Sequence, residues 1–422
     1  MTPPFYQPVR ALPDGDFGVS TRRTAFTTGE SAPRARGFRV SRAALYWFLM
    51  ALGVRLVAGI VIHLYSLASG YGGFYPLASG ADDVTYWDLT QRIYAGLDVP
   101  FVANDYPFVL ARFYHLVGGP DLFVGKLLNI FAGALTVWFG VLLVQELTRK
   151  GFAVEARRRA VRWAGLLLTF YPSLLWYSTQ LVKDPLLVLA GMAALYFQVC
   201  LLRRFQPLLV VGWLVSFAGL FPFRPYAAAA LALSLLIYML RFKPKWLVPA
   251  FVIMAVLPYL LGKGWFGLAS IQNVAVNADT IAQFRQSSYS IGGSSAGITI
   301  NYSNPILFLL TYSYSFVTAM FGPFPWQIKA VGQAVALPEA MMMWALFPVW
   351  LRGVRDLRRR VKPGTGTSSR REVALLLFSL VLIGVIAVFS DNIGANTRLR
   401  LLPWSAFLLY ASLKMPRFKR LR

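Results

Sequence analysis

Sulfur and imidazole side chains are scarce in this chain. Its 422 residues include one cysteine, Cys200, and two histidines, His63 and His115. A lone cysteine cannot form an intramolecular disulfide, and two scattered histidines without an HExxH or CxxC motif do not make a metal site. We therefore expect Cys200 to be a small buried or lipid-facing residue and both histidines to be structural.

Acidic residues are also few. The 17 Asp and Glu residues stand against 42 Lys and Arg residues, which gives a formal net charge of +25. Such an excess is typical of nucleic-acid-binding proteins, but here the basic residues fall in short clusters between apolar runs. That arrangement is the positive-inside pattern of membrane proteins. The sequence therefore argues against a nucleic-acid partner and predicts contact with membrane lipids.

Long apolar runs make up most of the chain. Hydrophobic residues form 57% of the chain, and its mean hydropathy is +0.55. Several runs approach the ~20 residues that a helix needs to cross a bilayer, so we expect an all-α polytopic membrane protein with about ten transmembrane helices, or eleven to twelve if further segments span. Outer-face loops and interfacial helices complete the expected fold. The predicted spans are 43–66, 122–147, 163–181, 185–202, 207–222, 225–240, 246–262, 336–351, 373–390 and 401–415.

The basic clusters set the expected orientation and domain limits. If these spans are right, most of the 42 Lys and Arg residues fall on one side, which is then the cytoplasmic side. Residues 1–42 have no apolar periodicity and indicate a disordered basic cytoplasmic tail. Residues 43–415 form the transmembrane domain, and 416–422 a basic cytoplasmic C-terminus. We expect a bacterial-type plasma membrane protein with loops 67–121 and 263–335 outside.

One further apolar segment does not fit this count. Residues 304–322 are long and apolar enough to span, but an eleventh helix there would move the basic stretch 352–371 to the outside. We therefore predict that 304–322 is re-entrant, lies along the outer interface, or pairs with a second short insertion at 323–335.

Two adjacent carboxylates, Asp82 and Asp83, lie in the first predicted outer loop, in the string SGADDVTYWD. Such a pair is unfavourable unless a cation, a proton or a hydrogen-bonded substrate shares the site. Both are candidate catalytic residues, and together they are candidate ligands for a divalent cation such as Mg²⁺ or Mn²⁺. The alternative is that they cap a helix that begins near Val84. Proximity to that helix slightly favours Asp83 as the reactive residue.

Basic side chains occur in the other predicted outer turns. Carboxylates with cations nearby suit an anionic, phosphate-bearing substrate, and the site is therefore predicted outside. Alternatives stay open, because Lys183 can pair with Asp184 at a helix start and the arginines can anchor at the interface. The candidate substrate- and phosphate-binding residues are Lys183, Arg224, Arg285, Arg398 and Arg400.

Arg55 lies near the middle of the first predicted span. An ionisable residue at that depth is functional by default or paired inside the protein. Glu339, near the outer end of its own span, is a candidate partner for Arg55 and also a candidate site residue.

These residues resemble the GT-C superfamily of polytopic glycosyltransferases, in its protein-mannosyltransferase-like branch. The resemblance covers most of residues 43–415. It rests on the acidic pair in the first outer loop and on TYWDLTQRIYAG (85–96), DYPFVLARFYHLVGG (105–119), KLLNIFAGALTVWFGVLLVQEL (126–147), YPSLLWYSTQLVKDPLLVLAGMAALY (171–196) and SDNIGANTRLRLLPWSAF (390–407).

The resemblance implies transfer of a sugar from a polyprenyl-phosphate donor to a lipid, glycan or protein acceptor, usually with inversion. It implies that Asp82 or Asp83 acts as a base or a metal-assisted acceptor binder. It also implies that Lys183, Arg224, Arg398 and Arg400 hold the carrier phosphate. The chain departs from better-known members in lacking a large C-terminal extracytoplasmic domain, so we expect the outer loops to recognise the acceptor.

Two other functions remain open at this point. A glycan polymerase or ligase also uses lipid-linked saccharides, but depends more on outer-loop arginines and a histidine than on an acidic pair. A lipid or solute transporter would place polar residues near the bilayer midplane and show repeated halves or broken helices. The sequence shows no convincing repeat, and the polar residues gather at one predicted surface.

Overall fold

The computed structural model describes residues 41–74, 82–99, 102, 104–149, 152–242, 285, 300, 304–329, 334, 336–360, 367–390 and 392–416. Helices joined by turns make up this part of the chain, with no strand in it, which confirms the predicted all-α class. The described residues belong to one compact unit. The predicted tail, the span 246–262 and most of the loop 263–303 lie outside the described residues.

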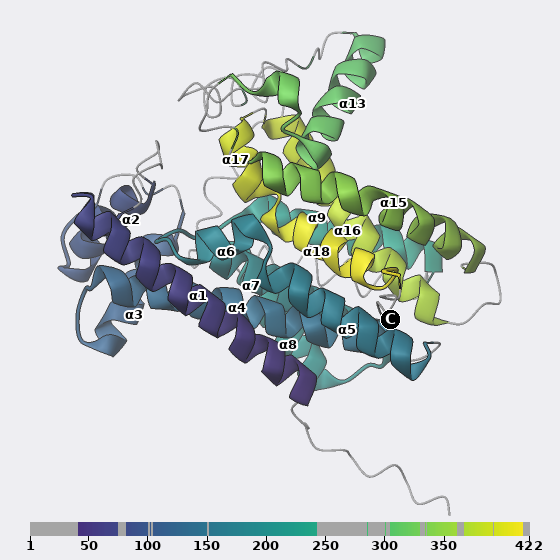
Figure 1. The fold of residues 1–422 in the computed structure, drawn as a ribbon, viewed down its shortest axis with the longest axis horizontal. Coiled ribbons are helices and arrows are strands. Elements are labelled where there is room, and N and C mark those ends of the chain that lie inside the picture. Colours follow the sequence, from purple (N-terminus) through teal and green to yellow (C-terminus); the bar gives the residue numbers. More distant parts are fainter. Residues whose placement is uncertain are drawn as a thin grey trace, which may run out of the picture. The chain divides into compact units, whose positions relative to one another are not determined.

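Five helices in the described part of the chain are long and apolar enough to cross a membrane (Figure 1). They match five predicted spans, 43–66, 122–147, 185–202, 225–240 and 373–390. The helices are α1 (Arg42–Ala68), α4 (Leu122–Leu147), α7 (Asp184–Arg203), α9 (Pro225–Phe242) and α16 (Thr367–Phe389), the last through its stretch Arg370–Phe389.

Three further helices match the predicted spans 207–222, 336–351 and 401–415 less well, and a fourth falls in the segment 304–322, which was not predicted as one of the ten spans. The apolar helices α8 (Pro207–Ala218), α13 (Pro305–Phe321) and α18 (Leu401–Ser412) are shorter. The long helix α15 (Leu337–Arg360) contains Pro348 and ends in a basic turn, and it is not one of the five. Length and composition thus support a polytopic membrane protein, while the number of spans and the path of 304–322 stay predictions.

The predicted span 163–181 is wrong as a single helix. The chain forms α5 (Val154–Thr169) and then the short α6 (Pro172–Ser178), with a break at Phe170 and Tyr171. Pro172 explains the break, because a proline has no N–H to continue the backbone ladder and restricts the residue before it.

Arg55 satisfies the carbonyl groups that this break leaves open. Its guanidinium donates to the carbonyl oxygens of Leu168 at 3.2 Å and Thr169 at 3.4 Å, and to the hydroxyl of Ser178 at 3.4 Å. The last carbonyls of a helix have no partner within the helix, and in a bilayer they need one from the protein. Arg55 is therefore paired internally, as one alternative predicted, but with backbone groups rather than with Glu339.

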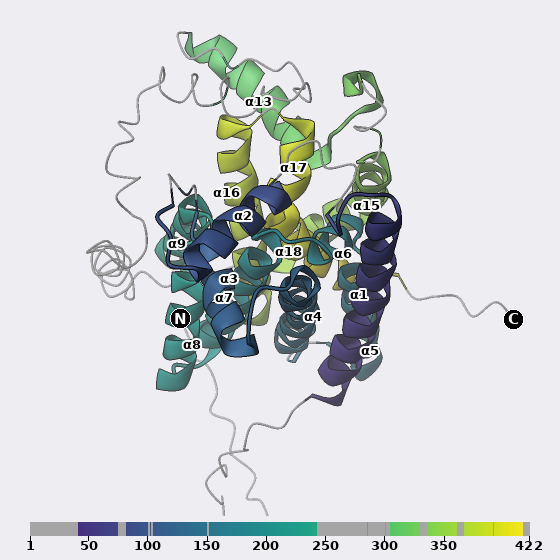
Figure 2. The ribbon, with the colours of Figure 1, turned by 90° about the vertical axis from the view of Figure 1, so that its left-hand side faces the viewer.

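The long helices pack side by side around α4, α7 and α18. Helix α4 contacts α1, α5 and α7, and α18 contacts α5, α7 and α16 (Figures 1 and 2). Every residue of α18 is buried. By contrast, α1 exposes many large apolar side chains along its length, as expected for a helix that faces lipid.

Turns that the charge pattern assigns to the cytoplasmic side lie together. Glu146, at the end of α4, bonds to Arg203 at 2.6 Å and to Arg371 at 3.2 Å. Glu372 bonds to Arg360 at 3.1 Å and to Lys414 at 2.8 Å. These contacts agree with the predicted pairing of turns on one side. Which side faces the cytoplasm stays a prediction.

The predicted outer loop 67–121 contributes two helices, α2 (Asp82–Tyr94) and α3 (Tyr106–Val117), which contact each other. The amide of Asn104 donates to the hydroxyl of Tyr86 at 3.0 Å, which ties the loop between these helices to α2. Near the other end of the chain, the short helix α17 (Ile393–Leu399) precedes α18.

Candidate functional site

Five charged residues from distant parts of the sequence form one cluster. Asp184 is its centre: the carboxylate is fully buried and accepts from Arg224 Nη2 at 2.6 Å and from Arg398 Nε at 2.9 Å. Asp82 bonds to Nη1 of the same Arg398. Lys183, the residue before Asp184, completes what we call the charged cluster.

Helix ends position these residues. Asp184 begins α7 and is followed by Pro185, while Arg224 directly precedes Pro225 at the start of α9. Proline suits the first turn of a helix, so both helix starts are fixed by the local sequence. Arg398 lies in the last turn of α17. The backbone carbonyl of Arg398 accepts from Arg224 Nη1 at 3.2 Å, which joins the two ends.

Arg398 links the two carboxylates of the cluster. Its guanidinium also lies 5.8 Å from the centre of the Tyr177 ring, and the Tyr177 hydroxyl is 2.8 Å from Thr397 Oγ1. Burial alone would lower the pKa of Arg398, but Asp184 and Asp82 raise this pKa well above its usual value. Arg398 therefore stays charged at any physiological pH.

Lys183 is the cation of the cluster that is available to a ligand. No described residue forms a hydrogen bond or an ion pair with its ammonium group. Burial and the nearby Arg224 lower the pKa of Lys183 to about 8, against the opposing effect of Asp184. With three cations and two carboxylates, the cluster carries an excess of positive charge that an anion can neutralise.

The two adjacent aspartates do not share a site. The side chain of Asp82 is 49% exposed, whereas Asp83 is 4% exposed and accepts from the backbone N–H of Val84 at 2.9 Å. The Asp83 charge acts on Lys126, whose ammonium donates to the carbonyl of Gly73. Both aspartates also lie in the first turn of α2, where negative charge suits the helix dipole.

The predicted divalent cation finds no ligand set in the described part of the chain. No group of three His, Cys, Asp or Glu side chains is close enough there to hold a metal ion. Asp82 is bonded to Arg398, and Asp83 faces different partners. The residues therefore do not fit a metal held between Asp82 and Asp83.

Arg400 belongs to a second, fully buried ion pair. Its Nε lies 3.6 Å from Oε1 of Glu339, and its guanidinium stacks over Trp404 with 4.0 Å to the ring centre. Glu339 also accepts from the hydroxyls of Tyr171, at 3.1 Å, and Ser173. Arg400, predicted to bind phosphate, is thus bonded to Glu339 instead of joining the charged cluster.

Arg285 is also placed apart from the charged cluster. It donates to the carbonyl oxygens of Ala387 at 2.8 Å and Val388 at 3.1 Å, and to the Ser315 hydroxyl at 3.1 Å. These carbonyls belong to the last turn of α16, so Arg285 caps this helix and holds α13 against it.

Sequence reasoning missed the central role of Asp184 and the presence of Tyr177. Asp184 was expected at most to pair with Lys183, yet its two partners are Arg224, just before α9, and Arg398 in α17. The sequence did contain a signal, because an acid directly before Pro185 stands at the start of an apolar helix. A carboxylate buried there needs a cationic partner.

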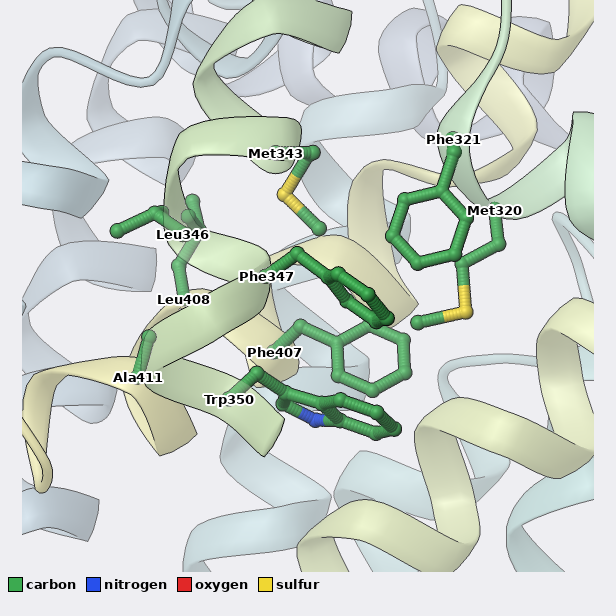
Figure 3. Close-up of a pocket in the computed structure, with 9 residues that line it drawn as sticks. All are labelled: Met320, Phe321, Met343, Leu346, Phe347, Trp350, Phe407, Leu408 and Ala411. Atoms are coloured by element: carbon green, nitrogen blue, oxygen red, sulfur yellow. The ribbon is translucent and has the colours of Figure 1, made fainter. Parts of the chain in front are cut away.

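An apolar pocket lies elsewhere, where α13, α15 and α18 meet (Figure 3). Its lining offers no charged group to a phosphate, so it does not belong to the charged cluster. The lining residues are Met320, Phe321, Met343, Leu346, Phe347, Trp350, Phe407, Leu408 and Ala411.

No protein-family model and no curated protein matches the chain. Among solved structures, it is similar to the crystal structure of ArnT from Cupriavidus metallidurans in the apo state. The two chains share 15% sequence identity with a TM-score of 0.38, and the match covers 88% of this chain and 77% of ArnT. Similarity at this level carries no argument about activity.

Proposed function

We propose that this protein is a membrane glycosyltransferase of the GT-C type. It would transfer a sugar from a polyprenyl-phosphate-linked donor to a lipid, glycan or protein acceptor at the outer face of the membrane. The observation that carries the proposal is the Lys183 ammonium, which has no partner among the described residues and lies near the Arg398–Asp82 ion pair. The resemblance of the sequence to the GT-C superfamily supports the same assignment.

The charge of the cluster suits the donor phosphate. A polyprenyl-phosphate sugar carries one negative charge on its phosphodiester, which balances the excess cation of the cluster. Lys183 and Arg398 would bind the phosphate oxygens, and Arg224 would hold Asp184 and Arg398 in place. Guanidinium and ammonium groups form their strongest hydrogen bonds with such anions.

Asp82 is better placed than Asp83 to act as the base, because it is half exposed and adjoins the cations. In the structure its carboxylate is bonded to Arg398 Nη1. A donor phosphate that takes over this nitrogen would release Asp82. The freed carboxylate could then accept the proton of the acceptor hydroxyl.

In the proposed reaction, the acceptor hydroxyl displaces the carrier phosphate from the sugar. The acceptor oxygen attacks the anomeric carbon from the face opposite the phosphate, which inverts the configuration. The bond between that carbon and the phosphate oxygen breaks, and its electron pair leaves with the carrier. Asp82 receives the hydroxyl proton. The carrier phosphate gains a second negative charge, which Lys183 and Arg398 stabilise as it develops.

Sugar transfer in nanodiscs tests the proposal. Wild-type protein receives radiolabelled polyprenyl-phosphate sugars and a membrane extract as the acceptor source. We expect Asp82→Asn to lower the turnover by about 10²–10⁴-fold, which is the usual contribution of a general base. The control is Asp88→Asn, on the same helix, because Asp88 forms an exposed ion pair with Arg92. It should keep normal turnover.

Two outcomes would redirect the assignment. Full transfer by both Asp82→Asn and Asp83→Asn would contradict a role for these acids and favour a glycan polymerase or ligase. Movement of the carrier across vesicle membranes without sugar transfer would contradict the enzyme and favour a transporter.

A further inference from the structure

Two basic side chains of α5 and two aromatic side chains of α1 line a groove. Arg158 and Arg162 lie one helical turn apart on α5, and Tyr46 and Trp47 come from the first turns of α1. The rest of the lining is apolar and includes Val161. None of these residues belongs to the charged cluster.

The aromatic side of the groove is fixed by close packing. The Trp47 indole lies directly on Gly165 of α5, where any Cβ would overlap its ring. The ring of Tyr46 meets that of Trp47 edge to face, with 5.3 Å between the ring centres. Trp47 is buried while Tyr46 is exposed. The groove therefore has a rigid aromatic floor and an aromatic rim.

The basic side of the groove has no acidic partner in the described part of the chain. Arg158 and Arg162 are both exposed, and no described residue forms a hydrogen bond or an ion pair with either. Glu155, one turn before Arg158, does not bond to them. Two guanidinium groups on neighbouring turns of one helix face can bind the same phosphate.

Close in sequence to Tyr46 and Trp47, α1 also exposes apolar side chains. On the outward face of α1, Leu45 is 40% exposed and Leu49 is 55% exposed, which suits contact with acyl chains. The same end of α1 is tied to the end of α4, since Gln145 donates to Ser41 Oγ at 2.8 Å. The turns that are predicted to be cytoplasmic lie at this same end of the helices.

We propose that this groove binds one anionic membrane phospholipid. Its headgroup phosphate lies on Arg158 and Arg162, and its acyl chains pass over Tyr46 and Trp47. Aromatic side chains favour the interfacial depth of a bilayer, and basic pockets between transmembrane helices select anionic headgroups.

Native mass spectrometry of the full chain tests the site. Protein reconstituted with phosphatidylcholine and phosphatidylglycerol is released from the bilayer, and the retained phosphatidylglycerol is counted against its mole fraction. We expect Arg158→Gln/Arg162→Gln to weaken retention of one phosphatidylglycerol about 30-fold, which corresponds to roughly 1 kcal/mol for each arginine. The control Arg157→Gln/Arg159→Gln removes the same charge outside the groove lining and should retain that lipid.

Equal losses in the two double variants would overturn the proposal, because the effect would then be a general attraction to the basic face. Equal binding of glycerol phosphate and phosphatidylglycerol would overturn it too, because the acyl chains would contribute nothing. A second readout is fluorescence quenching by brominated phosphatidylglycerol, which should fall in Trp47→Phe. Sugar transfer is measured separately, so failure of this site leaves the proposed function intact.

Discussion

Arg398 donates from Nε to one carboxylate oxygen of Asp184 at 2.9 Å, and its Nη2 lies 2.8 Å from the same oxygen. Asp184 is fully buried and also accepts from Arg224. A buried carboxylate is expensive to desolvate, and two guanidinium groups offset that cost. This relationship makes Asp184 the structural anchor for the cations that we assign to the donor phosphate.

Removal of the Asp184 carboxylate should destabilise the whole fold. Asp184→Ala would leave two guanidinium groups near each other without their shared acid, and we expect a loss of about 3–5 kcal/mol in the free energy of unfolding. Thermal unfolding of the purified protein checks this. Asp88→Ala removes an exposed acid and serves as the control. A melting temperature of Asp184→Ala within a degree of wild type would contradict the anchoring role.

The shape of the Arg398 side chain should matter as much as its charge. Arg398→Lys keeps the charge, but one ammonium cannot reproduce the planar fork that reaches both Asp184 and Asp82. We expect the donor kcat/KM to fall about 10- to 100-fold, the usual worth of one or two charged hydrogen bonds. Arg92→Lys, in an exposed pair with Asp88, should behave as wild type. An active Arg398→Lys enzyme would show that charge alone suffices.

Donor binding should weaken at alkaline pH. Burial and Arg224 lower the pKa of Lys183 to about 8, although Asp184 opposes them. Only the protonated form attracts a phosphate, so affinity is full below pH 8 and falls as the pH rises through that value. The donor KM measured across this range should rise above pH 8 in wild type. This rise in KM should be absent in Lys183→Gln. In Lys183→Arg it should move to higher pH.

The internal role of Arg55 predicts a tight limit on residue size beside it. A Cβ on Gly133 would lie 2.8 Å from Arg55 Nε and closer still to Ser178 Oγ. We expect Gly133→Ala to cost about 1–3 kcal/mol of stability, as overpacking does. The same change at Gly53 meets no atom within 4 Å and should gain up to ~1 kcal/mol from helix propensity. Melting temperatures of the two variants should therefore move in opposite directions.

Much of the fold could be predicted from residues that end helices and from the distribution of charge. Prolines and basic clusters mark the turns, and for that reason Asp82, Lys183, Arg224 and Arg398 were predicted together at one end of the helices. The break between α5 and α6 was not predicted, because the apolar run continues through Pro172 and hydropathy alone does not register a missing N–H.

The choice between neighbouring residues was beyond the sequence. Successive residues of a helix point about 100° apart, so Asp82 and Asp83 face different partners once both lie in the first turn of α2. Arg398 and Arg400 likewise face different partners. Arg398 belongs to the charged cluster, whereas Arg400 pairs with Glu339. Only the packing of other helices decides which of two adjacent charges meets which partner.

The complete burial of α18 has a consequence for biosynthesis. A ribosome makes the chain from its N-terminus, so α18 leaves it after α1 to α16 have been made. Its side chains have no lipid-facing surface, and they must enter a space that the earlier helices keep open. Arg398 lies in α17, the short helix just before α18, so the charged cluster is completed at the same late stage of synthesis. Until then the buried acid Asp184 lacks one of its two arginines, although the helix that carries it has already been made.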